Sequence, residues 1–164
     1  MRYLAATLLL STLLFAQNDI LEIDSVDFQA DDKKGISIFT GNVKVRMNQD
    51  KLNAKRVDVF FETDKNTNNK TPLRYEAIGD ADFEIVTADK HYVGKGDKII
   101  YNPKKEEYNI IGNGFVHEKK DDRKVYGDTI YVNQLSGEAR VKGSEQKPVR
   151  FIINVDRSDT KGKN

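Results

Sequence analysis

Two histidines, His91 and His117, are the residues of this chain best suited to acid–base chemistry or metal binding. A metal site needs three or four convergent ligands. The sequence has no cysteine and places no group of carboxylates close to either histidine. Both are therefore predicted to be polar residues of strands or turns, and we expect neither a metal nor a cofactor.

Other short patterns that could carry chemistry are incomplete. Gly94-Lys-Gly96-Asp-Lys is similar to a phosphate-binding loop, but it lacks the Gly-Lys-Ser/Thr ending and a following helix. Asp31-Asp32 and Asp121-Asp122 lie beside lysine pairs in polar segments, where solvated charge is the expected role. No serine lies in a nucleophile motif. The sequence therefore predicts a protein that is not an enzyme.

The overall charge argues against nucleic acid as a partner. Charged residues make up 32% of the chain, the apolar set makes up 38%, and the net charge is +1. Without the first 16 residues, which contribute one arginine, basic and acidic side chains are equal in number. Because nucleic acid requires a basic surface, we expect no nucleic-acid partner.

Residues 1–16 have the three parts of a secretory signal peptide. Arg2 supplies a positive charge, the run from Leu4 to Phe15 is almost wholly apolar, and Ala16 is a small residue before a polar segment. We expect cleavage after Ala16 and export of a soluble mature chain. The alternative is an uncleaved anchor, but the apolar run is shorter than the roughly 20 residues that span a bilayer.

Two short patterns alternate along the mature chain. The first is a small or apolar residue, two polar residues and then apolar-x-apolar; the second begins with glycine and a polar residue. Units of the first start at Ile23, Ala54, Gly96 and Gly127, and units of the second at Gly41, Gly79, Gly112 and Gly137. Polar turn-forming clusters separate these eight units. No apolar period of 3.6 residues is sustained, so we predict an all-β meander of antiparallel strands.

Changes of phase in the apolar–polar alternation of the long strands predict the shape of the sheet. In Phe39–Phe61 the apolar alternation is predicted to change phase at Gly41-Asn42 and at Lys55-Arg56. One extra residue moves the following side chains to the other face. A bulge or bend at these points lets both halves of a strand face inward. We therefore expect a single folded-over antiparallel sheet, a V or flattened roll of about eight bent repeat units.

The residues on the predicted inner face are mostly β-branched and of medium size. Two interpretations fit them: an ordinary packed β-sandwich core, which the pattern alone favours, or a groove that admits an acyl chain. The predicted inward residues are a set of fourteen, Ile36, Ile38, Val43, Val45, Val57, Val59, Phe61, Phe83, Ile85, Ile99, Tyr101, Val116, Ile130 and Val132, together with Val26, Phe28, Ala81, Val141, Phe151, Ile153 and Val155.

Several segments resemble the OstA family of LptA-like periplasmic lipopolysaccharide transport proteins. The resemblance rests on Phe39-Thr-Gly-Asn-Val43, on Val26–Asp31, on the strand Leu52–Val59 and on the repeated Gly-Asp/Asn bends. It extends over nearly all of the mature chain. It implies a β-jellyroll over residues 17–155, with about sixteen antiparallel strands folded like a slightly twisted taco.

The resemblance also implies a function. The open interior would receive the acyl chains of lipid A, so that the fourteen inward residues become candidate lipid contacts. The protein would join edge to edge with further copies of itself, with an inner-membrane LptC-like jellyroll and with an outer-membrane LptD-like jellyroll. An apolar trough of this kind lowers the cost of about 0.8 kcal/mol for each CH₂ group left in water.

The two edges of the sheet are the expected pairing surfaces. The strands Leu21–Phe28 and Val149–Val155 would present unpaired backbone groups, which a neighbour can extend by β-augmentation. Head-to-tail contacts of this kind make open filaments. The candidate edge residues are Leu21, Ile23, Val26, Phe28, Val149, Phe151, Ile153 and Val155, and residues 156–164 are expected to form a polar tail.

Two other functions stay open from the sequence. One is a membrane-anchored LptC-like jellyroll, which would keep its N-terminal helix. The other is a structural envelope β-domain that fills its own interior and carries no lipid. An acid or base cluster lining the groove would favour an enzyme.

Overall fold

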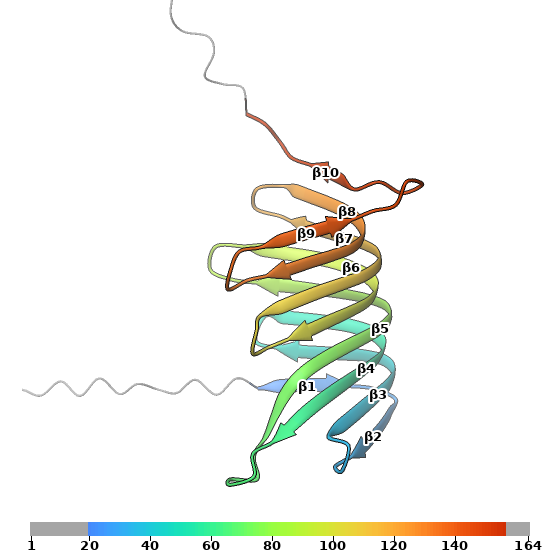
Figure 1. Ribbon diagram of the computed structural model, residues 1–164, viewed down its shortest axis with the longest axis vertical. Helices are drawn as coiled ribbons and strands as arrows, with labels where there is room; N and C mark the ends of the chain where they lie inside the picture. Colours follow the sequence, from blue (N-terminus) through green and yellow to red (C-terminus); the bar gives the residue numbers. More distant parts are fainter. Residues whose placement is uncertain (1–19, 157–164) are drawn as a thin grey trace, which may run out of the picture.

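The computed structural model describes residues 20–156, and within them the chain forms one open antiparallel sheet of ten strands without a helix (Figure 1). The predicted signal peptide at 1–16 and tail residues 157–164 lie outside this described part. The prediction of an all-β fold built from one antiparallel sheet is confirmed. The strands are β1 (Leu21–Asp24), β2 (Asp27–Asp31), β3 (Ile36–Met47), β4 (Asp50–Thr63), β5 (Lys70–Val86), β6 (His91–Asn102), β7 (Glu107–Glu118), β8 (Arg123–Asn133), β9 (Ala139–Lys142) and β10 (Arg150–Ile152).

Long strands form the centre of the sheet and short strands form its edges. Strands β3 to β8 follow one another as hairpins, each paired with its sequence neighbours. At one edge β1 and β2 both pair with β3, and at the other β9 and β10 both pair with β8. When the bend in each of the six long strands is counted as a boundary, the described sheet has the sixteen segments that the resemblance implies.

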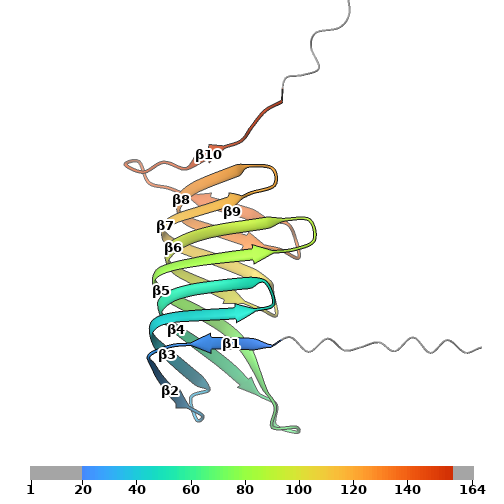
Figure 2. The same ribbon diagram turned by 180° about the vertical axis from the view of Figure 1, so that it is seen from behind.

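Each long strand bends near its middle, so the sheet folds into two facing arms (Figures 1 and 2). We name them by their residues. Arm A contains β1, β10 and residues 43–54, 81–96 and 114–127, and arm B contains β2, β9 and residues 36–40, 56–78, 98–111 and 129–133.

A glycine followed by Asn or Asp makes the bend in β3, β5 and β7. Both residues of each pair have positive φ, a conformation that glycine adopts without strain and that Asn and Asp tolerate better than other residues. At each pair, two residues lie opposite one residue of the following strand, β4, β6 or β8. The φ angles are 91° and 44° at Gly41 and Asn42, 85° and 45° at Gly79 and Asp80, and 78° and 50° at Gly112 and Asn113.

The change of phase occurs in the partner strands and not in the glycine strands. In β4 the inward side chains change from even to odd residue numbers across Lys55-Arg56, as predicted. In β3 they stay odd from Phe39 to Val43 across Gly41-Asn42. Gly41 and Asn42 add two residues to the alternation of β3, so the following side chains keep their face. A single added residue would move them to the opposite face. The predicted phase change at Gly41-Asn42 is therefore wrong.

Because β3 does not change phase at its bend, Ile36 and Ile38 lie on the outer face of arm B. Directly opposite residues of antiparallel strands share a face, and these two pair with Phe60 and Asp58, which are not part of the hydrophobic core. The expectation that Ile36 and Ile38 face inward is wrong. Phe39, which the prediction omitted, packs against the core in their place.

The hydrophobic core lies on the inside of the fold, close to the bends. Its buried members are small or β-branched side chains that flank the bends on neighbouring strands. The two arms therefore pack together where they join. These residues are Val43, Val45, Ala54, Val57, Val59, Ala77, Ala81, Ile99, Ile110 and Ile130.

We expect Gly112→Ala to lower the free energy of unfolding by about 2 to 4 kcal/mol, because it combines positive-φ strain with a steric clash. The φ angle is 78°, and an added Cβ would collide with the carboxylate of Asp97 on β6. Gly137→Ala is the matched control, since Gly137 has a φ of 73° but no atom within 4 Å of an added Cβ. It should cost about 1 kcal/mol. Urea denaturation followed by circular dichroism measures both, and equal losses would contradict a role for the contact at the bend.

Candidate functional site

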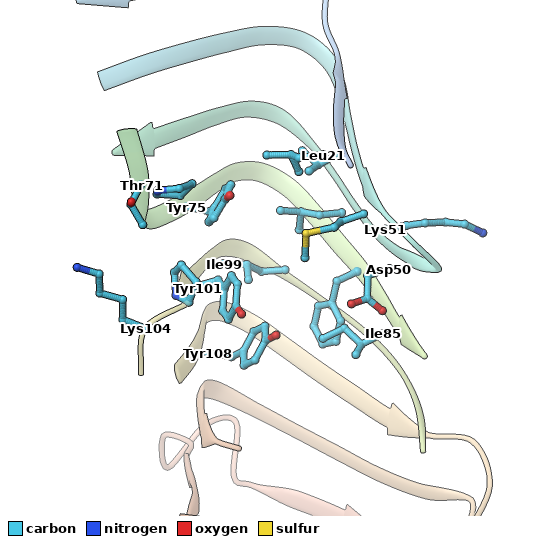
Figure 3. A pocket seen from close by; sticks show the side chains of 16 residues that line it. Leu21, Asp50, Lys51, Thr71, Tyr75, Ile85, Ile99, Tyr101, Lys104 and Tyr108 are labelled. Atoms are coloured by element: carbon cyan, nitrogen blue, oxygen red, sulfur yellow. The ribbon is translucent and has the colours of Figure 1, made fainter. Parts of the chain in front are cut away.

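The two arms enclose a groove that opens between their tips. Its volume is about 430 Å³, and residues of both arms line it (Figure 3). Most of the lining is apolar, so the groove suits a hydrocarbon better than a charged ligand. Arm A contributes Leu21, Val45, Met47, Asp50, Lys51, Leu52, Phe83 and Ile85, and arm B contributes Thr71, Pro72, Tyr75, Ile99, Tyr101, Pro103, Lys104 and Tyr108.

A glycine on arm A keeps part of this space open. Gly94 on β6 is buried and lies directly opposite Phe83 on β5. A Cβ at position 94 would collide with the Phe83 ring. Glycine therefore allows the ring to lie over the neighbouring strand instead of projecting across the groove.

Three tyrosines stand side by side on arm B. Tyr75, Tyr101 and Tyr108 are direct cross-strand neighbours on β5, β6 and β7. The ring centroids of Tyr75 and Tyr101 are 6.0 Å apart, those of Tyr101 and Tyr108 are 4.4 Å apart, and both pairs are stacked. In Figure 3 the Tyr101 and Tyr108 rings extend toward the side of the groove where Asp50 and Ile85 lie.

Burial raises the pKa of all three phenols above the ordinary value of 10, most strongly for Tyr108. The negative charge of Asp50 contributes to the raised pKa of Tyr101 and of Tyr108. Asp50 itself accepts a hydrogen bond from the backbone N–H of Val86 at 3.0 Å. The tyrosines are therefore neutral at physiological pH and face one carboxylate across the groove.

The fourteen predicted inward residues fall into three groups. Five line the groove, seven lie on the inner face within the core or packed against it, and two lie on the outer face. The groove residues are Val45, Phe83, Ile85, Ile99 and Tyr101; the seven are Val43, Val57, Val59, Phe61, Val116, Ile130 and Val132; and the outer two are Ile36 and Ile38.

Several groove residues were not among the predicted inward residues. Met47 and Leu52 continue the inward alternation of their strands, so the pattern was sufficient to find them. Tyr75 and Tyr108 alternate with the buried Ala77 and Ile110, which is the signal that identifies them as inward. Tyrosine also occurs on exposed strand faces, so its type alone is a weaker inward signal than that of Val or Ile.

Exposed apolar side chains gather at the two edges of the sheet. Of the twelve large apolar side chains that are exposed within residues 20–156, eight lie at these edges. Phe28 pairs with Phe39, and Phe151 pairs with Val125, yet the two edge phenylalanines are 59% and 62% exposed. The eight are Ile20, Leu21, Val26, Phe28, Val149, Phe151, Ile153 and Val155.

The C-terminal edge differs in part from its prediction. Only Arg150–Ile152 of the segment Val149–Val155 pairs with β8, along the arm A half of that strand. Ala139–Lys142 forms the arm B half of the same edge. At the N-terminal edge the chain also divides, into β1 and β2 on either side of Ser25-Val26. Each edge thus follows the bend of the sheet.

The side chain of each histidine contacts a nearby carboxylate. His91 Nε2 lies 2.8 Å from Glu84 Oε1, and His117 Nε2 lies 2.7 Å from Asp122 Oδ1. Within the described range, no group of three or more His, Cys, Asp or Glu residues could hold a metal ion. Nor does any helix in this range have the length and apolar character to cross a membrane.

The raised pKa of Tyr108 predicts a loss of stability at high pH. Above about pH 10 the unfolded chain releases this proton while the folded chain keeps it, so the free energy of unfolding falls as pH rises. By pH 11 the loss from Tyr108 should reach about 1.4 kcal/mol. Tyr108→Phe should therefore show a smaller fall than wild type between pH 9 and pH 11 in urea denaturation. Identical falls in the two proteins would contradict the assigned environment of Tyr108.

Comparisons with known proteins agree with this geometry. Among solved structures, LptH from Pseudomonas aeruginosa, described as the LptA homologous periplasmic component of the lipopolysaccharide transport device, matches with a TM-score of 0.67 and 17% identity. The match covers 83% of this chain and 96% of that chain, and it supports the jellyroll fold. A comparison with curated proteins gave no match.

A family model described as LptA/(LptD N-terminal domain) LPS transport protein matches residues 22–138. The matched region begins in β1 and ends just before β9, so it contains every long strand of the described sheet and both walls of the groove. The resemblance found in the sequence is confirmed, and this chain belongs to the LptA/LptD N-terminal domain family of lipopolysaccharide transport proteins.

Proposed function

We propose that this protein is an exported periplasmic component that binds lipopolysaccharide and shields the lipid A acyl chains during transport from the inner to the outer membrane. The observation that carries the proposal is the apolar groove of about 430 Å³ between the arms, in a chain of a lipopolysaccharide transport family. Each CH₂ group moved from water into such a groove gains about 0.8 kcal/mol.

The distribution of side chains supports acyl contacts near the arm tips. The buried residues that flank the bends form the floor, so an acyl chain would lie above them. Ile85 and Phe83 would contact it from arm A, and Tyr101 and Ile99 from arm B. Transport requires release as well as binding, and an open groove between two arms allows a chain to enter and leave sideways.

We further propose that the two edges of the sheet pair with neighbouring jellyrolls. These neighbours would be other copies of this chain, an inner-membrane LptC-like component and an outer-membrane LptD-like component. Pairing arm A with arm A would place β10 of one copy beside β1 of the next, and β9 beside β2. The two grooves would then form one continuous groove. The exposed rings of Phe28 and Phe151 would become buried at the contact.

Binding of purified mature chain to lipopolysaccharide, measured by isothermal titration calorimetry, tests the groove. We expect Ile85→Asp to weaken binding at least about tenfold, because a carboxylate would have to be desolvated against the acyl chain. Ile111→Asp is the matched control, since Ile111 lies on the outer face opposite Lys98 and Thr129 and is 40% exposed. It should bind like wild type. Absence of binding by the folded wild-type protein would contradict lipid binding in the groove and favour a structural envelope domain whose interior is an ordinary core.

Light scattering at increasing protein concentration tests the edges. Phe28→Glu and Phe151→Glu should each abolish self-association, because a head-to-tail contact uses both edges. An equimolar mixture of the two variants should form dimers and nothing larger, since one copy keeps an intact N-terminal edge and the other an intact C-terminal edge. Leu135→Glu, in the exposed turn before β9, should associate like wild type. Association of either single variant at the wild-type level would contradict edge pairing.

A further inference from the structure

The mostly apolar groove contains polar groups on two opposite sides. On arm B the rings of Tyr101 and Tyr108 are stacked with their centroids 4.4 Å apart, and both line the groove. On arm A the carboxylate of Asp50 lines the same space, and its negative charge contributes to the raised pKa of both phenols. Figure 3 shows these side chains directed into the groove from the two arms.

Neither side exhausts its hydrogen-bonding capacity within the described residues. Each tyrosine hydroxyl has one O–H hydrogen and lone pairs that a ligand can use. The Asp50 carboxylate accepts from the N–H of Val86, but an ionised carboxylate has about four acceptor positions. A plain alkyl chain laid between the arms would strip water from both sides and replace none of its hydrogen bonds, which is unfavourable.

The chemistry of the two sides limits what can lie between them. An anionic group such as a phosphate would be repelled by Asp50. A neutral group that both donates and accepts would satisfy both sides, donating to the carboxylate of Asp50 and accepting from the tyrosine pair. A hydroxyl on an acyl chain is the smallest group of this kind, and the rest of the chain would remain on the apolar walls.

We propose that this groove selects acyl chains that carry a hydroxyl group, which is bound between Asp50 and the Tyr101–Tyr108 pair. This inference rests on the proposed function, since it names the acyl chains that the groove prefers. It assigns Asp50, Tyr101 and Tyr108 as specificity-determining residues, whereas the surrounding apolar side chains bind any acyl chain. The raised pKa of the phenols keeps them as donors over the physiological pH range.

Acylglycerols that are monomeric in solution provide the test. The probes are 1-decanoylglycerol and a series in which one hydroxyl is placed at successive carbons of the same chain. Calorimetry should show at least fivefold tighter binding for the hydroxylated chain at one position and a smaller preference elsewhere, because the polar residues occupy one fixed depth. Fivefold corresponds to about 1 kcal/mol, the net value of one hydrogen bond.

Variants assign the preference to the proposed residues. Tyr101→Phe and Tyr108→Phe should bring the affinities of the hydroxylated and plain probes to within twofold of each other. Asp50→Asn keeps an acceptor for the Val86 N–H and should reduce the preference without unfolding the hairpin. Tyr131→Phe is the control, because the Tyr131 hydroxyl donates to Glu107 at 3.2 Å on the outer face. It should keep the full preference.

The outcomes separate this inference from the proposed function. Equal affinities across the probe series, or a preference that persists in both phenylalanine variants, would overturn the inference and leave lipopolysaccharide binding intact. Binding of lipopolysaccharide without binding of any hydroxylated probe would also overturn it. Failure to bind lipopolysaccharide would overturn both proposals.

Discussion

The bend at which two residues of one strand lie opposite one residue of the next is the constraint on which the rest of this fold depends. The two residues have positive φ, and contacts across the bend support them: Lys55 Nζ lies 2.8 Å from the Asp80 carboxylate, and the Asn113 amide donates to Asp97 at 3.0 Å. Because two added residues preserve the face and one reverses it, inward side chains occur on both sides of a bend, such as Phe39 and Val43 in β3 and Ala54 and Val57 in β4. If a bend added one residue where it now adds two, or two where it now adds one, the side chains that now form the core of one arm would lie on the outer face in water.

The same constraint explains why the interior is filled at the bends and open at the tips. Close to a bend the arms are near one another, and small or β-branched residues such as Val57, Ala77 and Ala81 are buried between them. Farther out, larger side chains including the stacked tyrosines line each wall, and a groove remains between them. An open groove and uncovered edges leave apolar surface in water, which is unfavourable for an isolated copy. Cargo in the groove and neighbours at the edges would remove this surface from water, and this is the physical link between the proposed functions.

Charged side chains give the outer face of arm B a different character. Arg56 pairs with Asp58 at 2.7 Å, and Lys98 pairs with Glu76 at 2.6 Å, on the side of the sheet away from the groove. The carboxylates of Asp58 and Glu76 are largely covered while their basic partners reach water, so these pairs satisfy the carboxylates and present charge to solvent on this face. The contrast between the faces leaves the groove and the edges as the main apolar surfaces open to a ligand or partner.

The sequence by itself determined the fold class, the number of repeat units, the position of the bends, and most of the inner face, because period-two alternation and glycine-polar pairs are local signals. It identified Val43 and Val57 correctly and assigned Ile36 and Ile38 to the wrong face. Only the tertiary structure revealed this error, because the register with the neighbouring strand determines whether a bend contains one extra residue or two. It also decided which inward residues are core and which line a groove, and it brought Asp50 opposite Tyr101 and Tyr108. These relations join residues of different arms, whose separation is set by the packing at the bends and leaves no periodic trace in the sequence.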